Sequence, residues 1–244
     1  MRNIKLTLEY DGTHFFGFQK QKRHRSVQSE LELALKKLFQ KKIKVIASSR
    51  TDSGVHAEGQ VVNFHVRSKI LLSKIQLGLN RYLPEDLAVR QIVEVPKNFH
   101  SQFLAKWKTY EYRVLNAKHR SPLKRFRAFQ VLEPLNLNKM KQAARLLCGK
   151  HDFRAFEASG SRRISAVRTI RKFEVEQKGE TIYFTVEANG FLYKMVRSLV
   201  GTLLEIGSGT LEMADLNKAI GLKLRSNIGQ TVPPQGLTLT RVTY

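Results

Sequence analysis

Hydrophobic and polar residues alternate from Ile4 to Tyr10, and this period of two predicts a half-buried strand at the start of the chain. After Ser26, apolar residues recur at helical spacing, which predicts an amphipathic helix with Ser26 as its N-cap. The same criteria predict, in the first half of the chain, strands over 3–10, 43–47, 60–66 and 87–95 and helices over 26–39 and 73–82. The polar segment SSRTDSGVHAEG lies between two of these strands, so we expect it to form a loop.

The second half of the chain mixes strands and helices in the same way. In KWKTYEYRVL, Lys108, Tyr110 and Tyr112 fall on one face of a predicted strand. The pattern predicts strands over 106–115, 126–131, 166–176, 180–188 and 237–242 and helices over 138–147 and 191–206, with a hairpin at Lys178-Gly179. Because strands and helices do not alternate regularly, we expect an α+β fold with antiparallel sheets, in two mixed domains over about 1–105 and 106–244.

The charge of the chain narrows its possible partners. The 244 residues include 43 Lys and Arg against 20 Asp and Glu, a formal net charge of +23, and the excess is spread over both halves. Such a field attracts polyanions and favours a nucleic-acid partner. The chain is 42 % hydrophobic and can bury a core, so disorder is not expected. On composition alone, a ribosome-bound or merely soluble basic protein remains the alternative.

Cysteine content, histidine spacing and hydropathy exclude several classes of protein. Cys148 is the only cysteine, which excludes an intramolecular disulfide and multi-cysteine metal sites, and the seven histidines lack the close pairing of metal ligands. No apolar run approaches the ~18 residues of a membrane span, and the N-terminus alternates like a strand instead of resembling a signal peptide. We therefore expect a cytoplasmic protein without membrane association.

The predicted loop contains the candidate chemistry. RTDSGVHA places Asp52 two residues after Arg50, between two buried strands. A carboxylate can attack electrophilic carbon, and a nearby cation favours its charged form. The alternative is an ordinary turn, since Asp-Ser-Gly supplies a side-chain acceptor and a permissive glycine. Two other enzyme classes fit less well, because metal-dependent nucleases need several acidic ligands and glycosidases need two carboxyl groups.

RTDSGVHA, followed by GQVVNF, resembles the active-site motif of the tRNA pseudouridine synthase A (TruA) family. Further segments resemble that family in the same order: LEYDGTHFFGFQKQ with SVQSELELAL near the N-terminus, then FHSQFLAKWKTYEYRV, FLYKMVRSLVGTLLEIG and the C-terminal PPQGLTLTRVTY. The resemblance therefore covers nearly the whole chain. It implies a pseudouridine synthase fold, in which the sheets of two domains meet at a central active-site cleft.

The resemblance also implies an activity and a set of site residues. The activity is isomerisation of uridine to pseudouridine at positions 38, 39 and 40 in the anticodon stem-loop of tRNA, by a homodimer that needs no cofactor. Asp52 would be the catalytic nucleophile and attack C1′ or C6, or deprotonate the ribose. Arg50 would occupy the space of the flipped base and contact phosphate. Tyr110 would stack on uracil and assist removal of the C5 proton, and Arg197 would pair with Asp52.

Each of these residues also has an ordinary structural explanation. Arg50 could be a solvated arginine, Tyr110 could fill the core as we expect of Tyr112, and Arg197 could lie at the polar edge of its helix. We expect His56, within the loop, to be structural. Three basic segments are collectively candidates for binding the RNA backbone: Lys20–Arg25, Lys118–Arg120 with Lys124–Arg125, and Arg162–Arg163.

Overall fold

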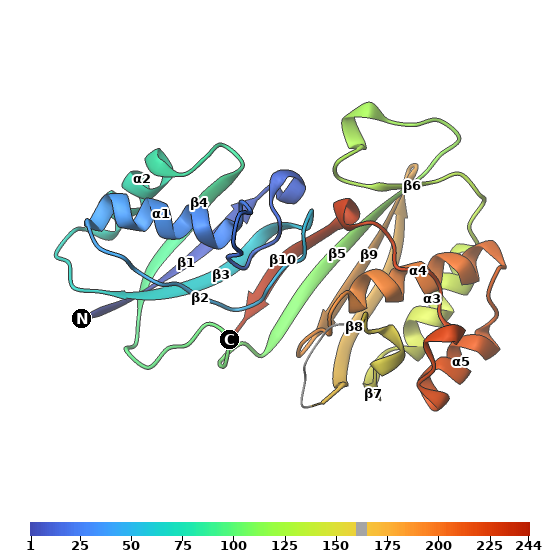
Figure 1. Cartoon of the computed structure of the whole chain (residues 1–244). Coiled ribbons are helices and arrows are strands. Elements are labelled where there is room, and N and C mark those ends of the chain that lie inside the picture. The colour runs from blue at the N-terminus through green and yellow to red at the C-terminus, as the bar shows by residue number, and fades with distance from the viewer. Residues whose placement is uncertain (160–164) are drawn as a thin grey trace. The chain divides into compact units, whose positions relative to one another are not determined.

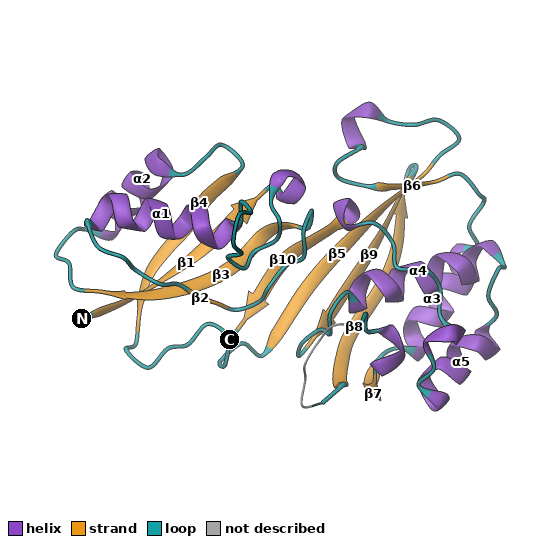
Figure 2. Cartoon of the chain, viewed as in Figure 1, coloured by secondary structure: helices purple, strands orange, loops and turns teal. Residues whose placement is uncertain are grey.

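The computed structural model of the chain describes residues 1–159 and 165–244, so the basic pair Arg162–Arg163 lies outside the described residues. The chain divides into two compact units (Figure 1). The first contains Met1–Lys106 and Thr238–Tyr244, and the second contains Trp107–Leu237. Each unit combines strands with helices, which Figure 2 distinguishes by colour.

A mixed sheet and the helices α1 and α2 form the first unit. Its elements are β1 (Arg2–Tyr10), α1 (Val27–Phe39), β2 (Ile46–Ala47), β3 (His56–Val66), α2 (Leu72–Tyr82), β4 (Leu87–Val95) and β10 (Leu237–Thr243). The strand order is β4-β1-β3-β10, and the short β2 also pairs with β3. β1 is antiparallel to β3 and β4, whereas β10 is parallel to β3. The last strand of the chain therefore belongs to the sheet that the first strands form.

Helix α1 begins where the sequence predicts it. Ser26 Oγ accepts a hydrogen bond from Ser29 N at 3.2 Å, and Ser29 Oγ accepts one from Ser26 N at 3.0 Å, so the helix starts with a capping box. Val27, Leu31 and Leu35 form the buried face of the helix. The predicted helix and its N-cap are confirmed.

Strand β3 begins at His56, four residues before its predicted start. Its additional residues pair with strands that are distant in the sequence, since Ala57 lies opposite both Tyr10 of β1 and Leu239 of β10. A pattern confined to the segment itself does not contain this information. The candidate loop is therefore shorter than expected and ends at Val55.

In the second unit the strand order is β6-β5-β9-β8-β7. Its elements are β5 (Trp107–Asn116), β6 (Phe129–Val131), α3 (Leu137–Leu146), β7 (Gly149–Asp152), β8 (Val167–Lys178), β9 (Thr181–Ala188), α4 (Met195–Ser208) and α5 (Met213–Leu222). The predicted α+β class is confirmed. Most strand pairs are antiparallel, but β6 is parallel to β5, as β10 is to β3. In both exceptions a long connection joins the strands, whereas a hairpin would have made them antiparallel.

The late helix is shorter than predicted, because α4 begins at Met195 and not near Phe191. Lys194 adopts a left-handed conformation with φ of +58°, which no residue of an α-helix can have. Before it, Met195 N donates to Leu192 O at 3.1 Å, so a turn leads into the helix. The sequence pattern does not predict β7, which is short and polar, or α5. The predicted hairpin is confirmed, with Gly179 at φ +59°.

Candidate active site

Asp52 lies in the loop between β2 and β3, and hydrogen bonds fix the backbone on both sides of it. Thr51 O accepts a hydrogen bond from Phe18 N at 3.0 Å, and Thr51 Oγ1 lies 2.8 Å from the Tyr10 hydroxyl oxygen. Asp52 O accepts a hydrogen bond from Val55 N at 3.2 Å, which closes a turn. The half-buried Asp52 is therefore positioned by the backbone of its neighbours.

The segment 11–18 lies directly against this loop, and two of its glycines permit the close approach. A Cβ at Gly12 would lie 2.0 Å from Val55 O, and one at Gly17 would lie 2.7 Å from Thr51 O. Gly17 also has a φ of +85°, which favours glycine over other residues. In the sequence these glycines stand out only as part of LEYDGTHFFGFQKQ. Their support of the Asp52 loop appears only in the structure.

Gln60 is a buried residue to which no sequence motif assigns a role. Its Oε1 accepts a hydrogen bond from Ser48 Oγ at 2.8 Å, and its Nε2 donates to Ser49 O at 2.9 Å. Ser48 N also donates to Val61 O at 2.8 Å. Gln60 therefore ties the first residues of the loop to β3. The one signal in the sequence is a polar residue directly before the apolar pair Val61-Val62.

Arg50 and His56, on either side of Asp52, have opposite environments. Arg50 is exposed, whereas His56 is buried. The Nδ1 of His56 accepts a hydrogen bond from Gly12 N at 3.0 Å and lies 3.1 Å from Asp11 Oδ1. This bond supports a structural role for His56.

Tyr110 lies on β5 of the second unit and is only 5 % exposed. Its ring meets the ring of Phe191 edge to face, with 5.1 Å between the centroids and an interplanar angle of 88°. This contact fixes the plane of the Tyr110 ring. Tyr112, on the same face of β5, is fully buried, and its hydroxyl donates to Pro233 O at 2.7 Å. The prediction that Tyr112 belongs to the core is confirmed.

Arg197 lies in the first turn of α4 and is half-buried. Its Nε donates to Val232 O at 2.7 Å, and Val232 N donates to Arg197 O at 3.3 Å. Burial raises the pKa of the Tyr112 hydroxyl above its ordinary value, and the positive charge of Arg197 opposes this rise. Arg197 is therefore held by a neighbouring segment, within electrostatic reach of the aromatic face of β5.

Lys108 shares this face of β5, and no sequence motif indicates a role for it. Its burial, with the nearby charge of Arg168 as the smaller cause, lowers the pKa of Lys108 to about 8. Arg168 is itself positioned by hydrogen bonds to Ser165 O at 3.1 Å and Val167 O at 2.7 Å. Two cations therefore lie near the end of β5 that carries Tyr110.

The predicted site residues are distributed over both units. Arg50 and Asp52 share one loop of the first unit, and Tyr110 and Arg197 both lie near Tyr112 in the second unit. That Asp52 meets Tyr110 and Arg197 in one cleft stays a prediction. Within residues 1–159 and 165–244, no group of three or more His, Cys, Asp or Glu side chains is placed to bind a metal ion. No helix in the same two stretches has the length and apolarity to cross a membrane.

A protein-family model described as tRNA pseudouridine synthase matches residues 7–103 and 143–244. The chain belongs to the tRNA pseudouridine synthase family, as its motifs indicated. It is 43 % identical to tRNA pseudouridine synthase A of Thermoanaerobacter sp. (strain X514) and 42 % identical to the protein of that name from Acetivibrio thermocellus. Both alignments cover the whole of this chain and the whole of the relative. The predicted family resemblance is confirmed.

Proposed function

We propose that this protein isomerises uridine to pseudouridine in the anticodon stem-loop of tRNA, at positions 38, 39 and 40, with Asp52 as the catalytic nucleophile. One observation carries the proposal. Asp52 stands in the RTDSGVHA loop of a chain from the tRNA pseudouridine synthase family, and backbone bonds from Phe18 and Val55 fix the loop on either side of it. A carboxylate held in this way is a nucleophile of defined position.

The proposed reaction conserves all atoms of the uridine. The N1–C1′ bond breaks, the uracil turns and the C5–C1′ bond forms, while C5 loses a proton and N1 gains one, so no oxidant, reductant or cofactor is consumed. The target base must first leave the helical stack. The carboxylate of Asp52 attacks C1′ or C6, or removes a ribose proton, and each route requires its ionised form.

The other site residues would assist this reaction in distinct ways. Arg197 pairs with Asp52 and keeps it ionised. Arg50, which is exposed, fills the space that the flipped base leaves and contacts phosphate, for which a planar guanidinium is suited. Tyr110 stacks on the uracil, and its hydroxyl assists removal of the C5 proton. The contact with Phe191 supports this role, because it fixes the ring plane on which a base would stack.

The proposed site needs residues of both units. We propose that the two units act as two domains, close to those expected over about 1–105 and 106–244 except that Thr238–Tyr244 joins the first, with their sheets meeting at a central cleft. We also propose that the protein is a cytoplasmic homodimer, in which one subunit positions the elbow of a tRNA and the other its anticodon arm. The positive charge spread over both halves of the chain supports extended contact with such a polyanion.

Release of tritium from tRNA that carries 5-³H-uridine tests the proposed reaction, because C5 loses its hydrogen when the C5–C1′ bond forms. We expect release with tRNA alone, and equally after chelation of metal ions once a control has excluded effects of magnesium on tRNA folding. An RNA-binding protein without activity, a nuclease or a glycosidase would release no tritium. Folded wild-type protein that leaves uridines 38, 39 and 40 unchanged would contradict the proposal.

A further inference from the structure

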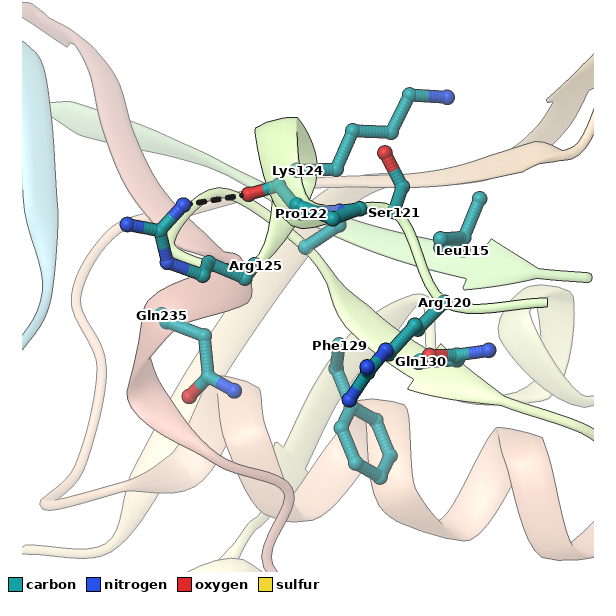
Figure 3. Close-up of a pocket in the computed structure, with 10 residues that line it drawn as sticks. Leu115, Arg120, Ser121, Pro122, Lys124, Arg125, Phe129, Gln130 and Gln235 are labelled. Carbon is teal, nitrogen blue, oxygen red and sulfur yellow. Dashed lines mark hydrogen bonds between the residues drawn. The ribbon is translucent and has the colours of Figure 1, made fainter.

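The second unit contains a basic pocket that the proposed reaction does not use. Its volume is about 570 Å³, within the range of sites that hold small ligands. Its walls come from the turn between β5 and β6, from β6 itself and from Gln235 in the 3-10 helix Pro234–Gly236 (Figure 3). We call it the 120–130 pocket, after the residues of the turn and β6 that line it.

Positive charge gathers around the 120–130 pocket, and its lining includes no carboxylate. Arg120, Lys124 and Arg125 line it, and none of these cations makes an ion pair with a residue in the described part of the chain. Lys124 Nζ donates to Thr181 Oγ1 at 3.1 Å, and Arg125 Nη1 donates to Pro122 O at 2.7 Å, the bond drawn in Figure 3. Both acceptors are neutral, so the three positive charges are not compensated within the pocket.

Uncompensated arginines favour an anion as the occupant of the pocket. Arg25 in the first unit shows the contrasting case, because its guanidinium binds both carboxylate oxygens of Asp86 at 2.7 Å. The same planar fork fits the oxygens of a phosphate, and the pocket arginines have no carboxylate to occupy them. A phosphate group is therefore the ligand chemistry that the pocket best accommodates.

Aromatic rings beside these cations indicate that the phosphate belongs to a nucleic acid. The guanidinium of Arg125 lies over the ring of Phe126, 4.2 Å from its centroid, and Phe126 is exposed. Phe129 contributes a second, half-buried ring to the lining, beside the amide of Gln130. Rings that can stack on bases, next to arginines that can bind phosphates, are typical of surfaces that bind single-stranded RNA.

The 120–130 pocket is separate from the Tyr110 site. It lies at the Leu115 end of β5, five residues beyond Tyr110, which corresponds to roughly 17 Å along an extended strand. The turn that forms it also falls within residues 104–142, between the two segments that the family model matches. A group bound there is too far from Tyr110 to contact a uracil stacked on that ring.

We propose that the 120–130 pocket binds a phosphodiester of the tRNA away from the target uridine, and so anchors the substrate without taking part in the chemistry. The inference rests on the proposed function only for the identity of the RNA. A second copy of this chain fits this pocket less well, because the three uncompensated cations of its lining favour an anion and the chain carries only 20 acidic residues against 43 basic ones.

The double variant R120Q/R125Q tests the proposal, with K139Q/R145Q as the matched control that removes two exposed cations from α3 of the same unit. We expect R120Q/R125Q to weaken binding of unmodified full-length tRNA about tenfold, and to reduce the slope of log Kd against log salt by about 1.5. The control should weaken binding less than about threefold. Thermal unfolding shows whether both variants keep their fold. At saturating protein, R120Q/R125Q should release tritium at the wild-type single-turnover rate.

Three results would overturn the proposal. Equal weakening by both double variants would show that only total charge matters. A change in the oligomeric state of R120Q/R125Q, measured as the mass of the assembly in solution, without a change in tRNA affinity, would make the pocket an interface between copies. Loss of binding to free uridine monophosphate, again with tRNA affinity unchanged, would make it a nucleotide site. These results leave the proposed reaction intact, whereas tRNA binding through the pocket without any tritium release would refute the reaction alone.

Discussion

The Asp52 loop of the first unit and the Arg120–Arg125 turn of the second are held in place by different means. Around Asp52, backbone packs on backbone, because Gly12 and Gly17 allow the segment 11–18 to approach more closely than any side chain would permit. The turn instead presents exposed charged side chains around a pocket. A nucleophile must be placed within a fraction of an ångström of its target, whereas binding of a polyanion depends mainly on charge. Catalysis by the Asp52 loop should therefore be most sensitive to a change of position. RNA binding by the Arg120–Arg125 turn should be most sensitive to a loss of charge.

Asp52→Asn should have the largest effect, because it removes the charge of the nucleophile and nearly preserves its shape. We expect the single-turnover rate of tritium release to fall by at least about 10³-fold. The affinity for tRNA should stay within about tenfold of the wild-type value, since many other cations bind the RNA. Substantial product from the purified variant would remove Asp52 from the mechanism.

Gly17→Ala changes position without changing charge. Its Cβ would lie 2.7 Å from Thr51 O, at a backbone φ of +85°. We expect the free energy of unfolding, measured in urea, to fall by about 1–3 kcal/mol. Displacement of the Asp52 loop should also lower the single-turnover rate about 10²-fold.

Gly221→Ala is the control for this substitution. Gly221 lies in α5, and no atom lies within 4 Å of a Cβ built there. An alanine at this position should stabilise the protein by about 0.5–1 kcal/mol, or leave its stability unchanged. Wild-type stability and rate for Gly17→Ala would show that the close approach of segment 11–18 is not needed.

The same two regions show what the sequence could predict. Local periodicity predicts α1 with its Ser26 cap, and it predicts the bounds of β1 and β4 to within one residue. The RTDSGVHA motif indicates the candidate chemistry. The contacts that support the Asp52 loop are not local, since Gly17 meets Thr51 and Gln60 reaches Ser49. Periodicity along one segment contains no information about such partners.

Long-range pairing also explains where the prediction of the fold was incomplete. The parallel pairs β3–β10 and β5–β6 depend on connections whose course the sequence pattern does not determine. The start of α4 depends on Lys194, a residue type that gives no sign of its left-handed conformation. The basic turn at 120–125 was predicted as a binding segment. Its pocket requires Gln235, which is more than one hundred positions away in the sequence.

Tyr110→Phe separates stacking from proton transfer in the second unit. The variant keeps the ring that meets Phe191 and loses only the hydroxyl. We expect tRNA affinity and its salt dependence to stay near wild type, while the single-turnover rate falls at least about tenfold. Tyr110→Ala should reduce both affinity and rate. A wild-type rate for the Phe variant would assign the hydroxyl no chemical role and leave Tyr110 as a stacking surface.

We expect the smallest effect from substitution of Lys108. Lys108 is a buried cation, in contrast to the exposed arginines of the 120–130 pocket. Its pKa of about 8 in the folded protein lies below the ordinary value of 10.5, mainly because of burial. Below pH 8 the lysine is charged in both the folded and the unfolded chain, and folding must desolvate that charge. Between pH 8 and 10.5 only the unfolded chain retains the proton, so the stability of the wild-type protein should rise with pH in this interval.

Lys108→Met should therefore be more stable than wild type at pH 7, by about 1–3 kcal/mol, which corresponds to a rise in Tm of several degrees. The advantage should shrink when the comparison is repeated at pH 9.5, because the wild-type folded protein has then lost the costly proton. Lys150→Met, at an exposed position of β7, is the control and should leave Tm nearly unchanged at both values of pH. A Lys108→Met variant whose advantage is the same at pH 7 and pH 9.5 would show that packing, and not the buried charge, causes the difference.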